Sequence, residues 1–186
     1  MMSPREDVKE AVIIVDMQKD NVGRFCGEII PNIKLLIDDA RRRGRPVIYA
    51  CDSRFRDDPL FRKLGFPEHA IRGTGGAEVI DEIKPQQGDI LVEKRMLSAF
   101  FGTDLDYTLR HKNIKSLIIA GIRTEACLLK TVLDAFELGY DVTVPSDACS
   151  SPSQQNHEAT LKILDVLKIR KATTKQLLAG LEAYPK

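Results

Sequence analysis

Three side chains of complementary chemistry stand at equivalent places along the sequence, each close to the end of a short apolar run. Asp16 follows AVIIV, Lys94 comes just past the run that starts at Ile90, and Cys127 comes shortly after SLIIA. A carboxylate can take the proton of a thiol and later return it to a leaving amine, while a nearby ammonium stabilises negative charge. These residue types indicate covalent acyl transfer with a cysteine nucleophile.

The surroundings of Cys127 in the sequence support that role. Cys127 lies three residues beyond Thr124, the candidate cap of a predicted helix, where the positive end of the helix dipole favours a thiolate. The turn GIRTEAC would bring the backbone N–H groups of Arg123 and Cys127 toward a developing oxyanion. None of the three histidines directly follows a predicted strand, so Asp16 is the expected base.

Each of these residues also has an ordinary structural interpretation. A carboxylate after a strand is often a loop residue or a cap, a lysine there usually faces solvent, and a cysteine early in a helix is usually a small core residue. Their coincidence at one edge of one predicted sheet favours catalysis. Cys26, Cys51 and Cys149 lack these features, and we interpret them as structural.

Short apolar runs alternate with longer amphipathic segments along the chain. The β-branched and apolar runs predict six strands at 11–15, 46–50, 90–92, 116–120, 142–144 and 170–172. Helical spacing of apolar residues predicts helices at 30–43, 104–112, 124–138, 156–167 and 174–183. The stretch from Asp52 to Gly76, rich in proline and glycine, is predicted to be a surface loop shaped for a site.

Alternating strands and helices with right-handed crossovers predict a three-layer α/β/α sandwich around a mainly parallel six-stranded sheet. The 186 residues suit a single domain over 1–186. Open parallel sheets bind ligands at the carboxyl ends of their strands, which is where Asp16, Lys94 and Cys127 fall. No GxGxxG or Walker pattern follows a strand, which disfavours a dinucleotide or nucleotide site.

Composition excludes several classes of function. Lys and Arg number 28 and Asp and Glu 27, so the net charge of +1 offers no basic field for nucleic acid. No apolar run approaches the ~18 residues of a membrane span. The four cysteines form no CxxC pair, which argues against a zinc knuckle or a disulfide framework and favours a reducing, cytoplasmic location.

The sequence resembles the isochorismatase-like cysteine hydrolases, the family of nicotinamidases and N-carbamoylsarcosine amidohydrolases. The matching segments are AVIIVDMQKD, EKRMLSAFFGTDLD and AGIRTEAC, with flanking similarity over nearly the whole chain. The resemblance implies a Rossmann-like fold with Asp16, Lys94 and Cys127 as the catalytic triad and a non-proline cis peptide between Ile122 and Arg123. It also implies a homo-oligomer, a dimer or tetramer.

Two departures from the family pattern concern the pocket and a metal. Nicotinamidases carry DMQNDF at the first motif, whereas this chain has Lys19, Asp20 and Asn21 after DMQ, so an aromatic wall is missing from its expected place. Of the family's metal ligands, Asp52 and His69 match, but Arg54 replaces the middle histidine. A guanidinium cannot ligate a metal, so we expect no metal or other cofactor, and an ion pair between Asp52 and Arg54 instead.

Two further pairs of residues are candidate substrate contacts. SAFFGT looks more like the N-carbamoylsarcosine amidohydrolase branch, and Phe100 and Phe101 could line the pocket or could equally pack against the sheet. Arg54 and Arg123 could face an anionic substrate group, although Arg54 could equally be a solvated surface charge.

The function predicted from the sequence is a cysteine amidohydrolase that cleaves a C–N bond of a small amide or carbamoyl compound and releases ammonia through a thioester-type intermediate. Asp16 would act as base and then acid, and Lys94 as the electrostatic partner. The alternative is a non-catalytic or redox-sensing member of the same fold that uses Cys127 as a reactive thiol.

Overall fold

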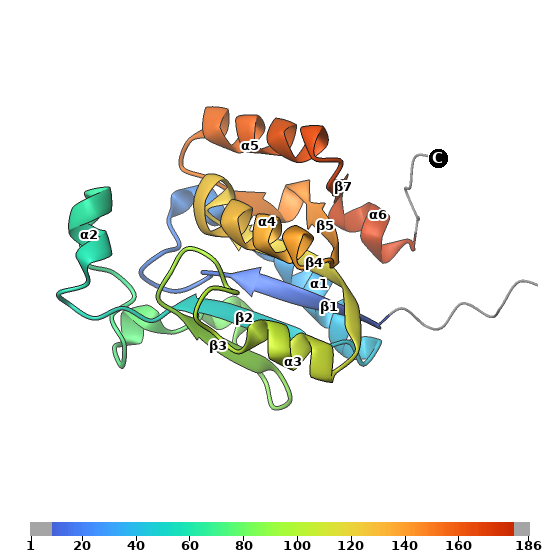
Figure 1. Cartoon of the computed structure of the whole chain (residues 1–186), viewed down its shortest axis with the longest axis horizontal. Helices are drawn as coiled ribbons and strands as arrows, with labels where there is room; N and C mark the ends of the chain where they lie inside the picture. Colours follow the sequence, from blue (N-terminus) through green and yellow to red (C-terminus); the bar gives the residue numbers. More distant parts are fainter. Residues whose placement is uncertain (1–8, 181–186) are drawn as a thin grey trace, which may run out of the picture.

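A parallel sheet forms the middle layer of the structure, a computed structural model that describes residues 9–180 (Figure 1). Its strands are β1 (Lys9–Val15), β2 (Val47–Asp52), β3 (Ile90–Lys94), β4 (Ile114–Ile122), β5 (Asp141–Pro145), β6 (Cys149–Ser150) and β7 (Arg170–Ala172). They are ordered β3-β2-β1-β4-β5-β7, with β6 pairing to β4, and these pairings are all parallel.

Helices cover both faces of the sheet. They are α1 (Ile30–Arg42), α2 (Pro59–Leu64), α3 (Leu105–His111), α4 (Leu129–Glu137), α5 (Gln154–Val166) and α6 (Thr174–Leu178). One core cluster joins the sheet to α3, α4 and α5, and a second joins it to α1 and α6. The result is the predicted three-layer α/β/α architecture, which Figure 1 shows with α3 and α4 in front of the sheet and α1 behind it.

The central strand shows why its sequence is continuously apolar. In β1, Ala11, Ile13 and Val15 point into one core, whereas Val12 and Ile14 point into the other. All five are buried because helices cover both faces of the sheet. An unbroken apolar run of this length therefore identifies a central strand of a doubly covered sheet.

The contact between β1 and β4 depends on a glycine. Gly121 has a φ of +121°, and a Cβ at this position would lie 2.2 Å from the carbonyl oxygen of Val15. Only glycine combines that backbone conformation with so close an approach. The strand order also reverses direction at β1 and β4, since the chain builds β2 and β3 on one side and β5 and β7 on the other. The carboxyl ends of β1 and β4 thus form the switch point where such sheets bind ligands.

The structure confirms the six predicted strands and changes four details. It adds the two-residue strand β6. Within the predicted loop it contains the short helix α2, which projects away from the sheet (Figure 1). The predicted helix 124–138 begins as a π-helical turn over Thr124–Leu128 before α4, and helix α6 ends at Leu178, while positions 181–183 of its predicted range lie outside the described residues.

Among the residues that the structure describes, none of the helices has the length and apolar character needed to cross a bilayer.

Candidate active site

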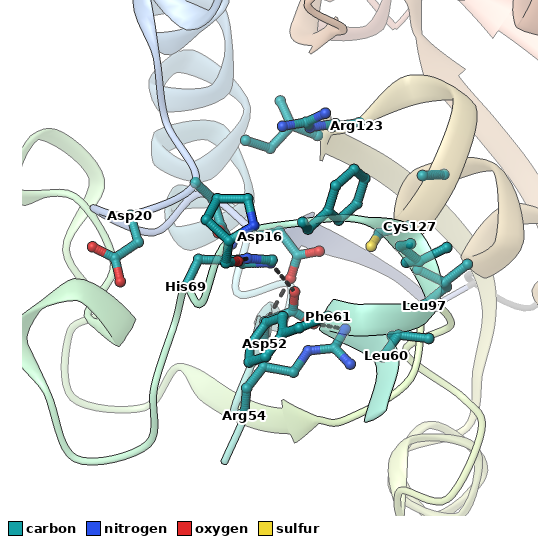
Figure 2. Close-up of a pocket in the computed structure, with 16 residues that line it drawn as sticks. Asp16, Asp20, Asp52, Arg54, Leu60, Phe61, His69, Leu97, Arg123 and Cys127 are labelled. Atoms are coloured by element: carbon teal, nitrogen blue, oxygen red, sulfur yellow. Dashed lines mark hydrogen bonds and ion pairs between the residues drawn. The ribbon is translucent and has the colours of Figure 1, made fainter. Parts of the chain in front are cut away.

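Asp16, Lys94 and Cys127 meet at the carboxyl edge of the sheet. Asp16 follows β1, Lys94 ends β3, and Cys127 lies in the turn after β4. Lys94 Nζ lies 2.8 Å from Asp16 Oδ2 and 2.7 Å from an oxygen of a fourth residue, Asp52. The sulfur of Cys127 and one oxygen of each carboxylate all lie within 4.8 Å of one another (Figure 2). The structure therefore brings together the three residues that the sequence singled out.

Local backbone geometry aims the Asp16 carboxylate across the strand ends. Asp16 has a φ of +54°, a left-handed conformation that aspartate tolerates better than most residues. Its backbone N–H donates to Ala50 O at 2.9 Å, and its Oδ1 accepts from the backbone N–H of Asp52 at 3.1 Å. The sharp turn at the end of β1 thus keeps the carboxylate over the ends of β2 and β3, next to Lys94.

The nucleophile turn, Thr124–Leu128, is a π-helical segment, a form of helix that is often found at functional sites. The carbonyl of Arg123 accepts from the N–H groups of Ala126 at 3.0 Å and Leu128 at 3.2 Å. Thr131 Oγ1 donates to the carbonyl of Cys127 at 2.7 Å. The peptide between Ile122 and Arg123, which leads into this turn, is cis.

Burial governs the protonation of Asp16 and Cys127. Burial, together with the neighbouring Asp52 carboxylate, raises the pKa of Asp16 from 3.8 to about 6, against the opposing effect of Lys94. Burial and the Asp16 carboxylate raise the pKa of the Cys127 thiol well above 9.0. Burial and the facing carboxylate of Asp16 therefore outweigh the helix dipole and Lys94, both of which favour the thiolate.

Lys94 is fully buried and nevertheless charged. Burial by itself would lower the pKa of Lys94, but the carboxylates of Asp16 and Asp52 raise it. Burial would likewise raise the pKa of Asp52, but Lys94, His69 and Arg54 hold it below its ordinary value. The resting site thus contains a buried ammonium between two carboxylates, of which Asp16 is the one that is protonated more readily.

Gln18 organises this cluster, although sequence reasoning assigned it no role. Its Oε1 accepts from the N–H of Asp52 at 2.8 Å, and its Nε2 donates to the carbonyls of Asp52 at 2.8 Å and Ala77 at 2.7 Å. The side chain is fully buried. The sequence feature that could have indicated this role is its position two residues after Asp16, in the segment DMQKD.

The residues around Asp52 do not fit a metal. Arg54 Nη2 lies 2.9 Å from Asp52 Oδ1, which is the predicted ion pair, and Arg54 also donates to the carbonyl of Arg95. His69 Nε2 lies 3.8 Å from Asp52 Oδ2. A cationic guanidinium therefore contacts Asp52, one of the two residues here that match metal ligands of the family, and a guanidinium cannot itself bind a metal. Asp16, Asp52 and Cys127 also converge, but there the ammonium of Lys94 is bonded to both carboxylates.

A cavity of about 150 Å³ opens onto the cluster formed by Asp16, Asp52 and Cys127. Its polar lining includes Asp20, Asn21 and Arg123 besides the cluster itself. The apolar part of its wall comes mainly from α2 and the segment after it, which contribute Leu60, Phe61, Leu64, Phe66 and Pro67. Leu97, which follows β3, adds to this wall. Phe61 and Phe66 thus supply the aromatic wall that is missing at positions 19–21.

The candidate substrate contacts divide between the cavity and other places. Phe100 lies in the core, with its ring 5.9 Å from that of Tyr140, and Phe101 is exposed, so the structure does not bring either to the cavity wall. Arg54 does line the cavity but is only 2% exposed, so it is not a solvated surface charge. Arg123 lines the cavity on the side opposite Arg54 in Figure 2.

Comparison with known proteins places this site in a family. The Isochorismatase domain model matches residues 10–176. An uncharacterized isochorismatase family protein of Bacillus subtilis is 36% identical over 176 residues, covering 91% of this chain and 93% of its own. A probable inactive nicotinamidase of Arabidopsis thaliana is 34% identical over 175 residues, covering 86% of this chain and 88% of its own.

A solved structure agrees with these sequence matches. The crystal structure of an N-carbamoylsarcosine amidase from Thermoplasma acidophilum superposes with a TM-score of 0.81 at 31% identity, covering 89% of this chain and 96% of that one. The match of the domain model over nearly the whole chain and the close structural likeness lead to one assignment. The chain belongs to the isochorismatase family and has the α/β fold of its hydrolases.

Proposed function

We propose that the protein is a cysteine amidohydrolase that cleaves a C–N bond of a small amide or carbamoyl compound. The observation that carries this proposal is the juxtaposition of a thiol, a carboxylate and a buried ammonium at the floor of a small cavity. The likeness to an N-carbamoylsarcosine amidase supports the same class of reaction. The proposed reaction needs only side chains and backbone groups of this protein, the substrate and water.

In the first half-reaction, the thiol proton of Cys127 moves to the Asp16 carboxylate as Sγ forms a bond to the substrate carbonyl carbon. The carbonyl oxygen becomes an oxyanion. We assign the backbone N–H groups of Arg123 and Cys127 as the donors that stabilise it. The C–N bond then breaks, and Asp16 gives its proton to the departing nitrogen, which leaves as ammonia. An acyl or carbamoyl thioester on Cys127 remains.

In the second half-reaction, Asp16 takes a proton from water while the water oxygen bonds to the thioester carbon. The C–S bond breaks, and the proton returns to the thiolate of Cys127, which restores the resting site. Lys94 stays protonated throughout and stabilises the Asp16 carboxylate and the developing negative charge. Because Cys127 rests as a thiol, the base Asp16 is needed to remove its proton before the C–S bond is complete.

The test is ammonia release from a panel of nicotinamide, pyrazinamide, N-carbamoylsarcosine, other carbamoyl amino acids and ureidoacrylate. At least one compound should be hydrolysed by the native protein, and Cys127→Ala should abolish that turnover. Cys149→Ala is the matched control, because Cys149 is also buried but does not line the cavity. Activity that persists in Cys127→Ala would show that the covalent mechanism is wrong.

The redox-sensing alternative predicts a different property of Cys127. A sensor thiol reacts with peroxide as the thiolate, in an exposed and electropositive setting. Cys127 is only 9% exposed, and its pKa is raised, which favours the hydrolase. Reversible oxidation of Cys127 by peroxide in a protein that hydrolyses none of the panel would instead favour the sensor.

A further inference from the structure

Arg123 is a cation at the cavity wall without an acidic partner among residues 9–180. Its guanidinium carbon lies 5.3 Å from the centre of the Phe66 ring, on the opposite wall segment. Within these residues no carboxylate comes within ion-pairing distance of it, and its side chain is exposed. A guanidinium placed in the wall of a reactive cavity and left without a counter-ion is available to an anionic ligand.

The other charged groups of the cavity are already engaged. Asp16 and Asp52 both bond to Lys94, and Asp20 Oδ2 accepts from the N–H of Ala70 at 2.9 Å. The guanidinium of Arg54 is bonded to Asp52 and to the carbonyl of Arg95. None of these carboxylates forms an ion pair with Arg123. Arg54 is 2% exposed and is held by these bonds, and among the described residues only its buried Nε is left without a partner, so Arg123 is the more accessible of the two cations.

The contact with Phe66 leaves the hydrogen-bond donors of Arg123 available. A cation–π contact is an attraction between charge and ring and uses no hydrogen bond. The N–H donors of a guanidinium match the two oxygens of a carboxylate in a bidentate arrangement. The neighbouring ring therefore does not consume the donors that bind anions.

Arg123 also lies close in sequence to the nucleophile, since it directly precedes the nucleophile turn that carries Cys127. A cavity of about 150 Å³ accommodates a benzene-sized molecule. We propose that Arg123 binds the carboxylate of the substrate, and that the substrates are short amides or ureides that carry a carboxylate at the end remote from the scissile C–N bond. This assignment rests on the proposed amidohydrolase function and narrows its substrate class.

The kinetic test compares anionic compounds with neutral compounds of the same shape. N-carbamoylglycine is paired with isobutylurea, and succinamate with 4-methylpentanamide, because in each pair a carboxylate is replaced by an isopropyl group. The native protein should prefer the anionic member. Arg123→Met should raise KM for the anionic member about 10- to 100-fold, the usual cost of losing a charged hydrogen-bond pair, and leave kcat and the neutral member nearly unchanged.

Two further variants make the result specific to the charge at this position. Arg123→Lys should restore part of the lost affinity, because it keeps the charge but not the bidentate edge. Arg43→Met, at the exposed arginine that directly follows α1 and does not line the cavity, should change neither constant. Equal losses for both members of a pair in Arg123→Met, or a fall in kcat alone, would overturn the assignment and show that Arg123 merely shapes the turn.

A binding measurement separates this proposal from the amidohydrolase proposal. Calorimetric titration of the four compounds into Cys127→Ala should show tighter binding of each carboxylate than of its neutral partner, and Arg123→Met in that background should remove the difference. If the native protein hydrolyses nothing but this difference is present, the amidohydrolase proposal fails and the carboxylate site stands. If neither carboxylate binds better than its neutral partner, the carboxylate site is wrong, whatever the enzyme hydrolyses.

Discussion

Asp16 and Cys127, the two groups that exchange a proton in the proposed reaction, both lie where their charged forms are disfavoured. The pKa of Asp16 is raised to about 6, mainly by burial, and the pKa of Cys127 is raised well above 9.0 for the same reason. A base with a pKa of about 6 is mostly ionised near neutral pH yet still returns a proton readily. The burial that makes the thiol a weak acid therefore also makes the carboxylate a stronger base.

The activity should depend on pH through Asp16. The base must be ionised, so kcat/KM should fall tenfold per unit as the pH drops below about 6, and it should level off above that value. Asp16→Asn should reduce activity by a factor of about 10² to 10⁴, the usual range for general acid–base catalysis. A native profile that stays flat between pH 5 and pH 8, measured by ammonia release, would contradict the assignment of Asp16 as the base.

The same shift predicts how Asp16 affects stability. The folded protein keeps a proton on Asp16 up to about pH 6, whereas an unfolded aspartate loses it near 3.8. The folded state binds more protons than the unfolded state between these two pH values. The contribution of Asp16 to the free energy of unfolding is therefore fully present below the lower value and is lost as the pH rises to the higher one. Relative to Asp16→Asn, native stability should fall by roughly 3 kcal/mol across this interval.

Urea unfolding of native protein and Asp16→Asn at pH 4 and pH 7.5 measures that difference. The free energy of unfolding of the native protein, relative to that of the variant, should be lower at pH 7.5 than at pH 4. This result would mean that the ionised base destabilises the folded protein. A gap between the two proteins that does not change with pH would show that Asp16 has the same pKa in both states.

We predict that the activity of the protein does not require a metal, because Arg54 occupies the position of a metal ligand. The native protein should keep its activity after dialysis against a chelator and should contain less than stoichiometric zinc, because Arg54 and Lys94 already supply positive charge at Asp52. Arg54→His should raise zinc affinity by completing a carboxylate and two imidazoles with Asp52 and His69. Stoichiometric metal in native protein purified without chelators, measured by atomic emission, would overturn this view.

At the scale of elements, the approach of β4 to β1 sets the position of the nucleophile. Gly121→Ala should destabilise the protein by more than about 3 kcal/mol, because a left-handed backbone and a collision with the carbonyl of Val15 act together. Gly139→Ala is the matched control, since Gly139 has a φ of +87° but open space around it. Equal losses in denaturant unfolding would show that backbone conformation alone, and not the strand contact, makes Gly121 necessary.

Most elements were predictable from the sequence because their burial is periodic. The central strands β1 and β2 contain apolar runs that are buried on both faces, and α1 buries Ile33, Leu36 and Ile37 at helical spacing. Helix α2 was not predictable, because PLFRKL is too short to show a period and buries only Phe61. The π-helical turn was not predictable either, because residues with helical periodicity do not specify which carbonyl each N–H selects.

At the scale of the whole molecule, the catalytic cluster was predictable and the cavity was not. Parallel strands bring their carboxyl ends to one edge, so topology alone places Asp16, Lys94 and Cys127 together. The cavity wall comes instead from the chain around Phe61 and Phe66, whose path depends on tertiary contacts such as that of Asp20 with Ala70. The expected dimer or tetramer stays a prediction, which sedimentation would test.

The strand order β3-β2-β1-β4-β5-β7 also divides the sheet into two halves that meet between β1 and β4. The chain up to Lys94 builds one contiguous half of the sheet and supplies the base and the ammonium, while the chain from β4 onward builds the other half and supplies the thiol. A chain cut between Phe101 and Gly102, both exposed, should therefore give two fragments that are inactive alone and active when co-expressed. Hydrolysis would then report whether the two halves have docked.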